Sequence, residues 1–158
     1  MLSSGLLVLA SIVFAQAEVK LPPAISAELE YLTGSWQTEG LFGGRPSKGE
    51  FRGEWAPGKF CVVLQAKSDQ GLATGIAGWD PATNEVIETW YNERLEKVEL
   101  RYKVASNTVK EGTLLVHSPN GQTGKGTVRS ERQSDEAFVV TAKMDTIEIT
   151  NRASRVNK

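Results

Sequence analysis

The strongest constraint on this chain is a strict alternation of apolar and polar residues along most of its length after Gly34. In segment 97–105 (KVELRYKVA), the even positions hold Val, Leu, Tyr and Val, and Glu, Arg and Lys lie between them. Segment 49–55 (GEFRGEW) repeats this with Phe, Gly and Trp on one face and charged residues on the other. Because successive side chains of a strand point to opposite faces, this period of two is typical of antiparallel strands with one face in water.

Turn-forming residues separate these alternating runs at short, regular intervals. Segments 56–59 (APGK), 80–84 (DPATN) and 118–121 (SPNG) carry Pro, Gly and Asn where turns use them. The pattern predicts about ten strands, with boundaries good to about three residues, at roughly 34–42, 48–56, 59–67, 72–80, 85–92, 96–105, 108–117, 123–133, 136–144 and 146–152.

Ten short strands joined by hairpin-length links favour an up-and-down meander. An open sheet of this size would leave long edges and one apolar face exposed, and closure removes both. We therefore predict an all-β fold, an antiparallel up-and-down β-barrel of about ten strands with a short N-terminal helix. A two-sheet sandwich is the alternative that alternation alone leaves open.

The first 17 residues have the features of a secretory signal peptide. An apolar run at 6–15 (LLVLASIVFA) is followed by Ala15-Gln16-Ala17, a small-x-small cleavage pattern. The run is shorter than the roughly 20 residues that span a bilayer, and no second apolar stretch follows. We expect cleavage after Ala17, a single domain over 18–158 without an integral membrane span, and a secreted or periplasmic protein.

A short helix is expected before the first strand. Ser26 is a candidate N-cap, Glu28 lies in the first turn, Leu29 and Leu32 share one face, and Gly34 ends the helix.

The charges and the few reactive residues narrow the function. The 18 Lys and Arg balance 19 Asp and Glu and are interleaved with them, which argues against nucleic-acid binding. Cys61 is the only cysteine, so no internal disulfide forms, and its apolar surroundings predict a buried structural thiol. His117 is the only histidine, which disfavours catalytic triads and the usual His/Cys metal sites.

Three segments together carry a resemblance to a known family. They are LTGSW at 32–36, WAPGKF at 55–60 and GWDPAT at 78–83. This pattern resembles that of the DUF1579-type lipocalin-like domains, a calycin-like family of uncharacterised function, over about residues 29–145. The resemblance implies a calycin-like barrel and says almost nothing about activity.

The resemblance also implies a structural role for one tryptophan. In calycin barrels, a Gly-x-Trp tryptophan plugs the barrel floor and packs on an arginine from the end of the chain. Carried over to this sequence, the tryptophan is Trp36 and the candidate partner is Arg152, just after the last predicted strand.

Aromatic side chains and one carboxylate form the candidate ligand pocket. Trp90 and Tyr91 are adjacent on a predicted strand, so only one of them faces the interior. Glu88 shares a face with Trp90, and a nearby Arg101 or Arg129 would make it a polar anchor for a ligand or part of a buried ion pair. The full candidate pocket comprises Phe51, Trp55, Trp79, Glu88, Trp90, Tyr102 and Arg129, although the aromatic residues would also serve as ordinary core.

These features lead to one main functional prediction and to alternatives. The main prediction is an exported barrel that binds a small lipophilic or aromatic molecule and needs no cofactor or metal. Haem ligation by His117, by analogy with the related nitrobindin-type barrels, is disfavoured because those barrels place their histidine near the C-terminus. The alternatives are a calycin-type isomerase or hydrolase using Glu88, Tyr91 or His117, and a filled barrel that acts through its surface in an envelope assembly.

Overall fold

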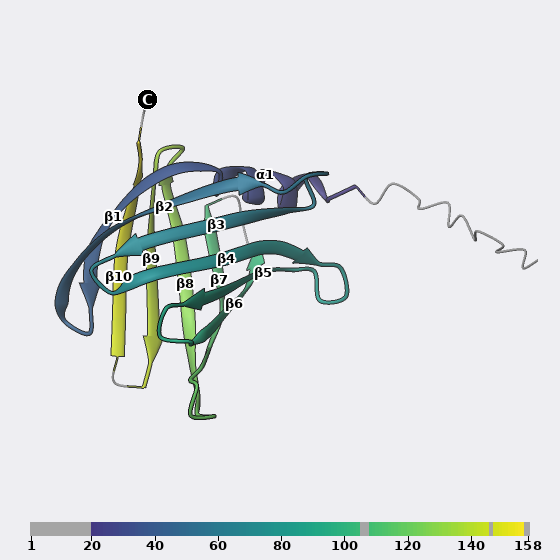
Figure 1. The fold of residues 1–158 in the computed structure, drawn as a ribbon. Helices are drawn as coiled ribbons and strands as arrows, with labels where there is room; N and C mark the ends of the chain where they lie inside the picture. The colour runs from purple at the N-terminus through teal and green to yellow at the C-terminus, as the bar shows by residue number, and fades with distance from the viewer. Residues whose placement is uncertain (1–19, 105–107, 146, 157–158) are drawn as a thin grey trace, which may run out of the picture.

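The strands form hairpin after hairpin along the chain and close on themselves (Figure 1). The structure is a computed structural model that describes residues 20–104, 108–145 and 147–156. Its elements are α1 (Pro23–Tyr31), β1 (Gly34–Phe42), β2 (Arg45–Trp55), β3 (Cys61–Ser68), β4 (Gly71–Asp80), β5 (Glu85–Asn92), β6 (Lys97–Val104), β7 (Val109–His117), β8 (Thr123–Ser134), β9 (Ala137–Met144) and β10 (Ile147–Arg155). The predicted leader, residues 1–17, lies outside the described residues.

Each strand pairs antiparallel with the next one in sequence, and β1 also pairs with β10. This closing register runs from Trp36 opposite Arg155 to Phe42 opposite Ile149. The predicted up-and-down barrel is therefore confirmed, and the sandwich alternative is wrong.

Two boundaries differ from the prediction in ways that matter for the site. Strand β10 continues to Arg155, because its last residues pair with the start of β1. Helix α1 begins at Pro23 after Pro22, so the prediction of Ser26 as N-cap is wrong. Proline suits the first helical position because its missing N–H has no partner there in any case.

Inward-facing glycines mark places where neighbouring strands approach very closely. A Cβ atom on Gly112 would lie 1.7 Å from the backbone oxygen of Arg101, and one on Gly40 would lie 1.8 Å from that of Thr150. Glycines at such positions let strands bend as a barrel closes.

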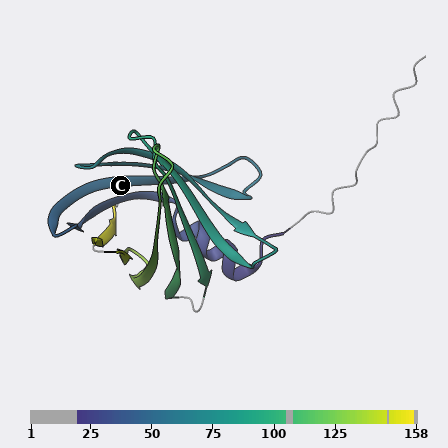
Figure 2. The same cartoon turned by 90° about the horizontal axis from the view of Figure 1, so that it is seen from below.

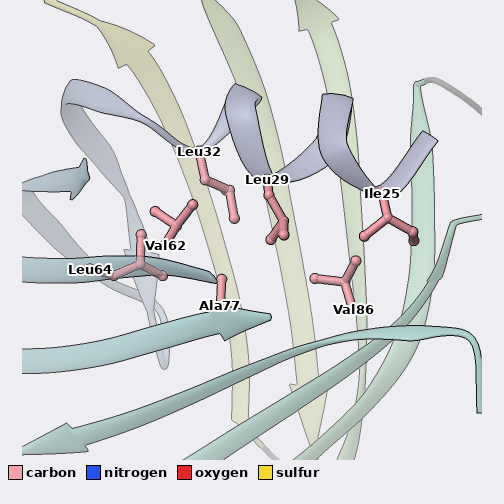
Figure 3. Close-up of a cluster of buried hydrophobic side chains, with 7 residues drawn as sticks. All are labelled: Ile25, Leu29, Leu32, Val62, Leu64, Ala77 and Val86. Atoms are coloured by element: carbon pink, nitrogen blue, oxygen red, sulfur yellow. The ribbon is translucent and has the colours of Figure 1, made fainter. Parts of the chain in front are cut away.

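One end of the barrel, which we call the helix end, is covered by α1 (Figures 1 and 2). Figure 3 shows Ile25 and Leu29 of α1, and Leu32 directly after it, pointing toward side chains of β3, β4 and β5. Val62 and Val86 are among these strand residues, and both are completely buried. The helix therefore fills the helix end with apolar side chains.

The opposite end, which we call the open end, carries the turns that join β1 to β2, β3 to β4, β5 to β6, β7 to β8, and β9 to β10. No helix among the described residues is long and apolar enough to cross a membrane.

Candidate functional site

Side chains on the inner face of the barrel become more exposed from the helix end toward the open end. On β3, the inward residues Val62 and Leu64 are buried, whereas Ala66 is only half-buried. On β6, Tyr102 is buried, whereas Leu100 and Val98 are half-buried. Solvent therefore reaches the inner face from the open end.

We call this partly exposed region the inner apolar surface. Its members lie on the same inward positions as the buried core residues, and the strand registers place them across from one another. They are Ala66, Ala73, Trp90, Val98, Leu100, Val116, Met144 and Ile149.

Glu88 lies at the deep side of the inner apolar surface. It is 7% exposed and sits between Val86 and Trp90 on the inner face of β5. The Trp90 indole Nε1 donates a hydrogen bond of 3.2 Å to one carboxylate oxygen of Glu88. Burial raises the pKa of Glu88, and the opposing influences of Lys110 and of the Trp90 hydrogen bond are smaller.

Tyr102 is the buried neighbour of Glu88 on the next strand. Val86 pairs with Tyr102 and Glu88 pairs with Leu100, so Glu88 and Tyr102 are diagonal neighbours on the inner face. Burial, and then the negative charges of Glu88 and Glu28, raise the pKa of Tyr102 well above its ordinary value of 10.0.

A buried ionic cluster lies beside this pair, beneath α1. Lys110 on β7 forms an ion pair with Glu28 of α1, and both are less than a tenth exposed. A terminal nitrogen of Arg132 lies 3.8 Å from the other Glu28 oxygen. The Lys110 ammonium also lies 4.8 Å from the ring centroid of Tyr102, within the range of a cation–π contact.

The sequence analysis missed this ionic cluster. The signal for Lys110 was present, because the alternation that places Leu114 and Val116 inward continues through Gly112 to Lys110. Glu28 lies one turn before Leu32 on α1, where an apolar face of the helix was expected.

Trp36 has the predicted place in a buried aromatic cluster but a different arginine partner. It is completely buried, and the Phe51 ring stacks on it at 5.7 Å between centroids. The guanidinium of Arg155 lies 4.2 Å from the Trp36 ring, whereas Arg152 is exposed. The prediction of Arg152 is wrong because residues 152 and 155 face opposite sides of β10, and the strand runs on to Arg155.

The other predicted pocket tryptophans belong to the helix end. Trp55 and Trp79 pack against the apolar cluster of α1. The Trp55 Nε1 donates to Glu30 at 2.6 Å, and the Trp79 Nε1 donates to Asn84 at 3.1 Å. Of the predicted pocket residues, Glu88, Trp90 and Tyr102 are neighbours on the inner face, and the aromatic residues, Trp90 and Tyr102 included, pack in or against the core clusters.

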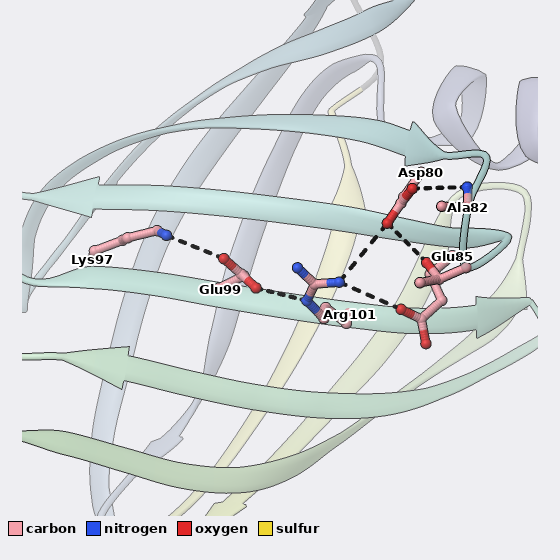
Figure 4. A network of polar contacts seen from close by, with 7 residues as sticks. Asp80, Ala82, Glu85, Lys97, Glu99 and Arg101 are labelled. Atoms are coloured by element: carbon pink, nitrogen blue, oxygen red, sulfur yellow. Dashed lines mark hydrogen bonds and ion pairs between the residues drawn. The ribbon is translucent and has the colours of Figure 1, made fainter.

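The two arginines proposed as partners of Glu88 lie on the outer face. Arg129 is exposed and pairs with Glu111 and Glu131, so its assignment to the pocket is wrong. Arg101 belongs to an outer-face network in which its Nε donates to Glu99 at 2.7 Å (Figure 4). Both residues occupy positions of the alternation opposite to those of the inward residues.

The same network orders the turn between β4 and β5. Asp80 accepts hydrogen bonds from the backbone N–H of Ala82 and from the Thr83 hydroxyl, and Arg101 lies 4.0 Å away (Figure 4). These contacts lower the pKa of Asp80, chiefly through the Ala82 hydrogen bond. The hydrogen bond from Arg101 likewise lowers the pKa of Glu99.

The remaining candidate reactive residues also face outward. Tyr91 is 59% exposed, as expected if Trp90 points inward. His117 lies on the outward positions of β7, with its Nδ1 3.2 Å from the Thr123 hydroxyl. Cys61 is half-buried rather than fully buried, and this burial raises its pKa. Within the described ranges, no group of three or more His, Cys, Asp or Glu residues is arranged to hold a metal ion.

The outer face of the barrel carries an apolar groove. A groove of about 490 Å³ runs over β4 and β5, and Ile76, Ile87, Trp79 and Tyr91 contribute to its lining. It is a competing location for an apolar molecule, so any binding experiment must separate it from the inner apolar surface.

The sequence matches no protein-family model and no curated protein. Several solved structures have a similar shape. A redesigned β-barrel, mFAP1, bound to DFHBI, is 15% identical, with a TM-score of 0.44 over 83% of this chain and 99% of that one. A second redesigned β-barrel is 14% identical, with a TM-score of 0.43 over 84% of this chain and 96% of that one. The DFHBI molecule is bound in the structure of mFAP1, and this comparison describes that barrel alone.

Proposed function

We propose that this barrel binds a small, largely apolar or aromatic molecule against the inner apolar surface. The observation that carries the proposal is the half-buried state of inward side chains such as Val98, Val116 and Met144. Apolar side chains left in contact with water inside a barrel gain free energy when a ligand displaces that water. The filled helix end limits the ligand to the half of the barrel near the open end.

The test is a titration with N-phenyl-1-naphthylamine, whose fluorescence rises in apolar surroundings. We expect saturable binding of one probe per barrel. Two residues of β4 then locate the probe: Ala73 faces inward, and Ile76 faces outward and lines the outer groove.

Ala73→Trp should abolish binding, and Ile76→Trp should leave it unchanged. The reverse result would place the probe in the outer groove, and the absence of saturable binding by the wild-type protein would refute the proposal. Ala66→Trp, on the inner face of β3, is a second blocking variant in case Ala73→Trp does not fold. Urea unfolding of each variant shows which of them are folded.

We further propose that the chain belongs to the DUF1579-type lipocalin-like family and is exported after cleavage following Ala17. The three sequence segments at 32–36, 55–60 and 78–83 and the small-x-small pattern support these proposals. Intact mass measurement of the protein from its own host is the test. A mature N-terminus at Glu18 is expected, and an uncleaved chain would contradict it.

A further inference from the structure

We propose that the Glu88 carboxyl and the Tyr102 hydroxyl form a pair of hydrogen-bond donors for a carbonyl oxygen of the bound molecule. This inference rests on the binding function proposed above and names the chemistry of the ligand. The two side chains are the polar groups at the deep side of the inner apolar surface, where the half-buried Trp90 and Leu100 adjoin them.

The first step concerns Glu88. Its carboxyl is almost completely buried, and among the described residues no ion pair is formed with it. The Trp90 indole Nε1 donates a hydrogen bond to one of its oxygens. A buried carboxylate without a paired cation is costly, so the group is expected to hold a proton that it can donate.

The second step concerns the charges around Glu88. Lys110 of β7 favours the charged carboxylate, but this ammonium is already paired with Glu28 of α1. Arg132 of β8 is directed to Glu28 as well, and Tyr102 of β6 is itself held neutral by burial. Lys110 and Arg132 therefore form their ion pairs with Glu28 beneath α1. Glu88 forms no ion pair with either of them.

The third step concerns Tyr102. Its position diagonal to Glu88 places the two side chains about 7–8 Å apart at the backbone, within reach of one shared ligand atom. Tyr102 as a whole residue is 2% exposed, and its ring lies beside the Lys110 ammonium. In such buried surroundings a hydroxyl that donates to a ligand oxygen makes a stronger hydrogen bond than it would in water.

A ketone, aldehyde or amide oxygen has two lone pairs and can accept from two neutral donors at once. A ligand amine is the opposite case, because it would require an ionised Glu88. A hydrocarbon of the same shape would leave both donors unsatisfied. We therefore expect the site to bind the carbonyl compound more tightly than the hydrocarbon.

The test uses three naphthalenes of nearly equal shape as competitors against N-phenyl-1-naphthylamine. They are 2-acetylnaphthalene, 2-isopropylnaphthalene and 1-(2-naphthyl)ethylamine. The wild-type protein should bind the ketone about tenfold more tightly than the hydrocarbon, as expected for two modest hydrogen bonds. The amine should bind more weakly than the ketone.

Variants then assign the preference to the two donors. Tyr102→Phe and Glu88→Leu should each reduce the ketone preference several-fold, because the ketone loses one hydrogen bond and the hydrocarbon no longer leaves that donor unsatisfied. Glu88→Gln keeps an N–H donor and should retain most of the preference. In the wild-type protein, the preference should decline as rising pH removes the Glu88 proton, whereas in Glu88→Gln it should not change with pH.

The outcomes separate this inference from the proposed function. If the probe does not bind, the binding function itself fails. If the probe binds but the ketone and hydrocarbon compete equally, the donor pair is refuted and the binding function stands. Preferential binding of the amine also refutes the donor pair, since it shows an ionised Glu88.

Discussion

Arg155, at the end of β10, binds backbone carbonyl groups at the end of α1 and just after it. Helix α1 ends at Tyr31, and the last carbonyl groups of a helix lack intrahelical donors. The Arg155 guanidinium donates to the carbonyl oxygens of Tyr31 at 3.1 Å and of Thr33 at 2.7 Å. It also lies against the Trp36 ring, so one side chain links α1, β1 and β10.

Removing this arginine should destabilise the barrel. We expect Arg155→Ala to lower the free energy of unfolding by about 2–3 kcal/mol, because charge-assisted hydrogen bonds and a cation–π contact are lost together. The matched control is Arg152→Ala on the exposed side of the same strand, with an expected change within about 0.5 kcal/mol. Urea unfolding followed by tryptophan fluorescence gives both values, and equal losses would contradict the assignment.

Individual residues show where sequence reasoning succeeds and where it fails. Alternation correctly places Trp90 inside and Tyr91 outside, because it depends only on counting along one strand. The choice between Arg152 and Arg155 needed the end of β10, which is set by pairing with a distant strand. The pairing of Lys110 with Glu28 needed the position of α1 inside the barrel, which local pattern does not contain.

At the scale of elements, α1 is attached to the barrel by both apolar and ionic contacts. Leu29 and Ile25 are buried among strand side chains, and Glu28 between them on the helix meets Lys110 and Arg132. A buried ion pair adds little net stability compared with an apolar replacement, but the loss of one partner is costly.

A double-mutant cycle should reveal this coupling. Lys110→Met should cost about 3 kcal/mol, because Glu28 keeps only the more distant Arg132. Glu28→Gln should also destabilise, and the double variant should lose about 1–3 kcal/mol less than the sum.

The exposed pair of Arg52 and Glu54 on β2 provides a control cycle of the same chemistry. Its coupling should be about 0.5 kcal/mol or less. Unfolding in urea measures both cycles, and the attachment argument fails if the two couplings are equal.

The close approach of neighbouring strands at inward-facing glycines leads to a prediction about the backbone. An alanine at Gly112 would bring its Cβ into the Arg101 carbonyl, whereas one at Gly78 would meet only the Cys61 Cβ at 3.7 Å. Gly112→Ala should therefore destabilise the protein by about 1–3 kcal/mol. Gly78→Ala should be neutral or slightly stabilising, because it restricts the unfolded chain.

Midpoints of urea unfolding compare the two glycine variants directly. A loss of stability in Gly78→Ala as large as that in Gly112→Ala would show that the close approach of β6 and β7 is not the cause.

Elements were predicted better than contacts, because strands and turns depend mostly on local chemistry. Asn84 shows this at the β4–β5 turn, where its φ of 56° matches the positive φ that asparagine tolerates. The start of α1 was missed, because Ser26 is a good N-cap by residue type but Pro22 and Pro23 place the first turn earlier.

On the scale of the whole molecule, the barrel has one filled half and one half whose inner face meets solvent. The bulk of α1 and the aromatic cluster around Trp36 fill the helix end. No comparable element covers the open end in the part of the chain that the structure describes. Glu88 lies at the boundary between the halves, so its protonation should affect the stability of the entire fold.

The pH dependence of unfolding tests this position. Because the pKa of Glu88 in the folded protein is raised above its ordinary value of 4.5, the folded state holds a proton that the unfolded state releases. Its contribution to stability is therefore complete below about pH 4.5 and is lost as the pH rises through the folded pKa, with a slope of at most about 1.4 kcal/mol per pH unit.

The glutamine side chain in Glu88→Gln cannot ionise. The free energy of unfolding of this variant, relative to that of the wild-type protein, should therefore increase with pH over this window and then level off. Urea unfolding at intervals between pH 4.5 and 9 measures the difference, with Glu54→Gln on the exposed face of β2 as the matched loss of a carboxylate. If the difference between Glu88→Gln and the wild-type protein did not increase with pH over this window, Glu88 would be ionised in the folded protein and held as an anion by Lys110. In that case the boundary between the filled and open halves would carry a charge, and the donor role proposed for Glu88 would fail with it.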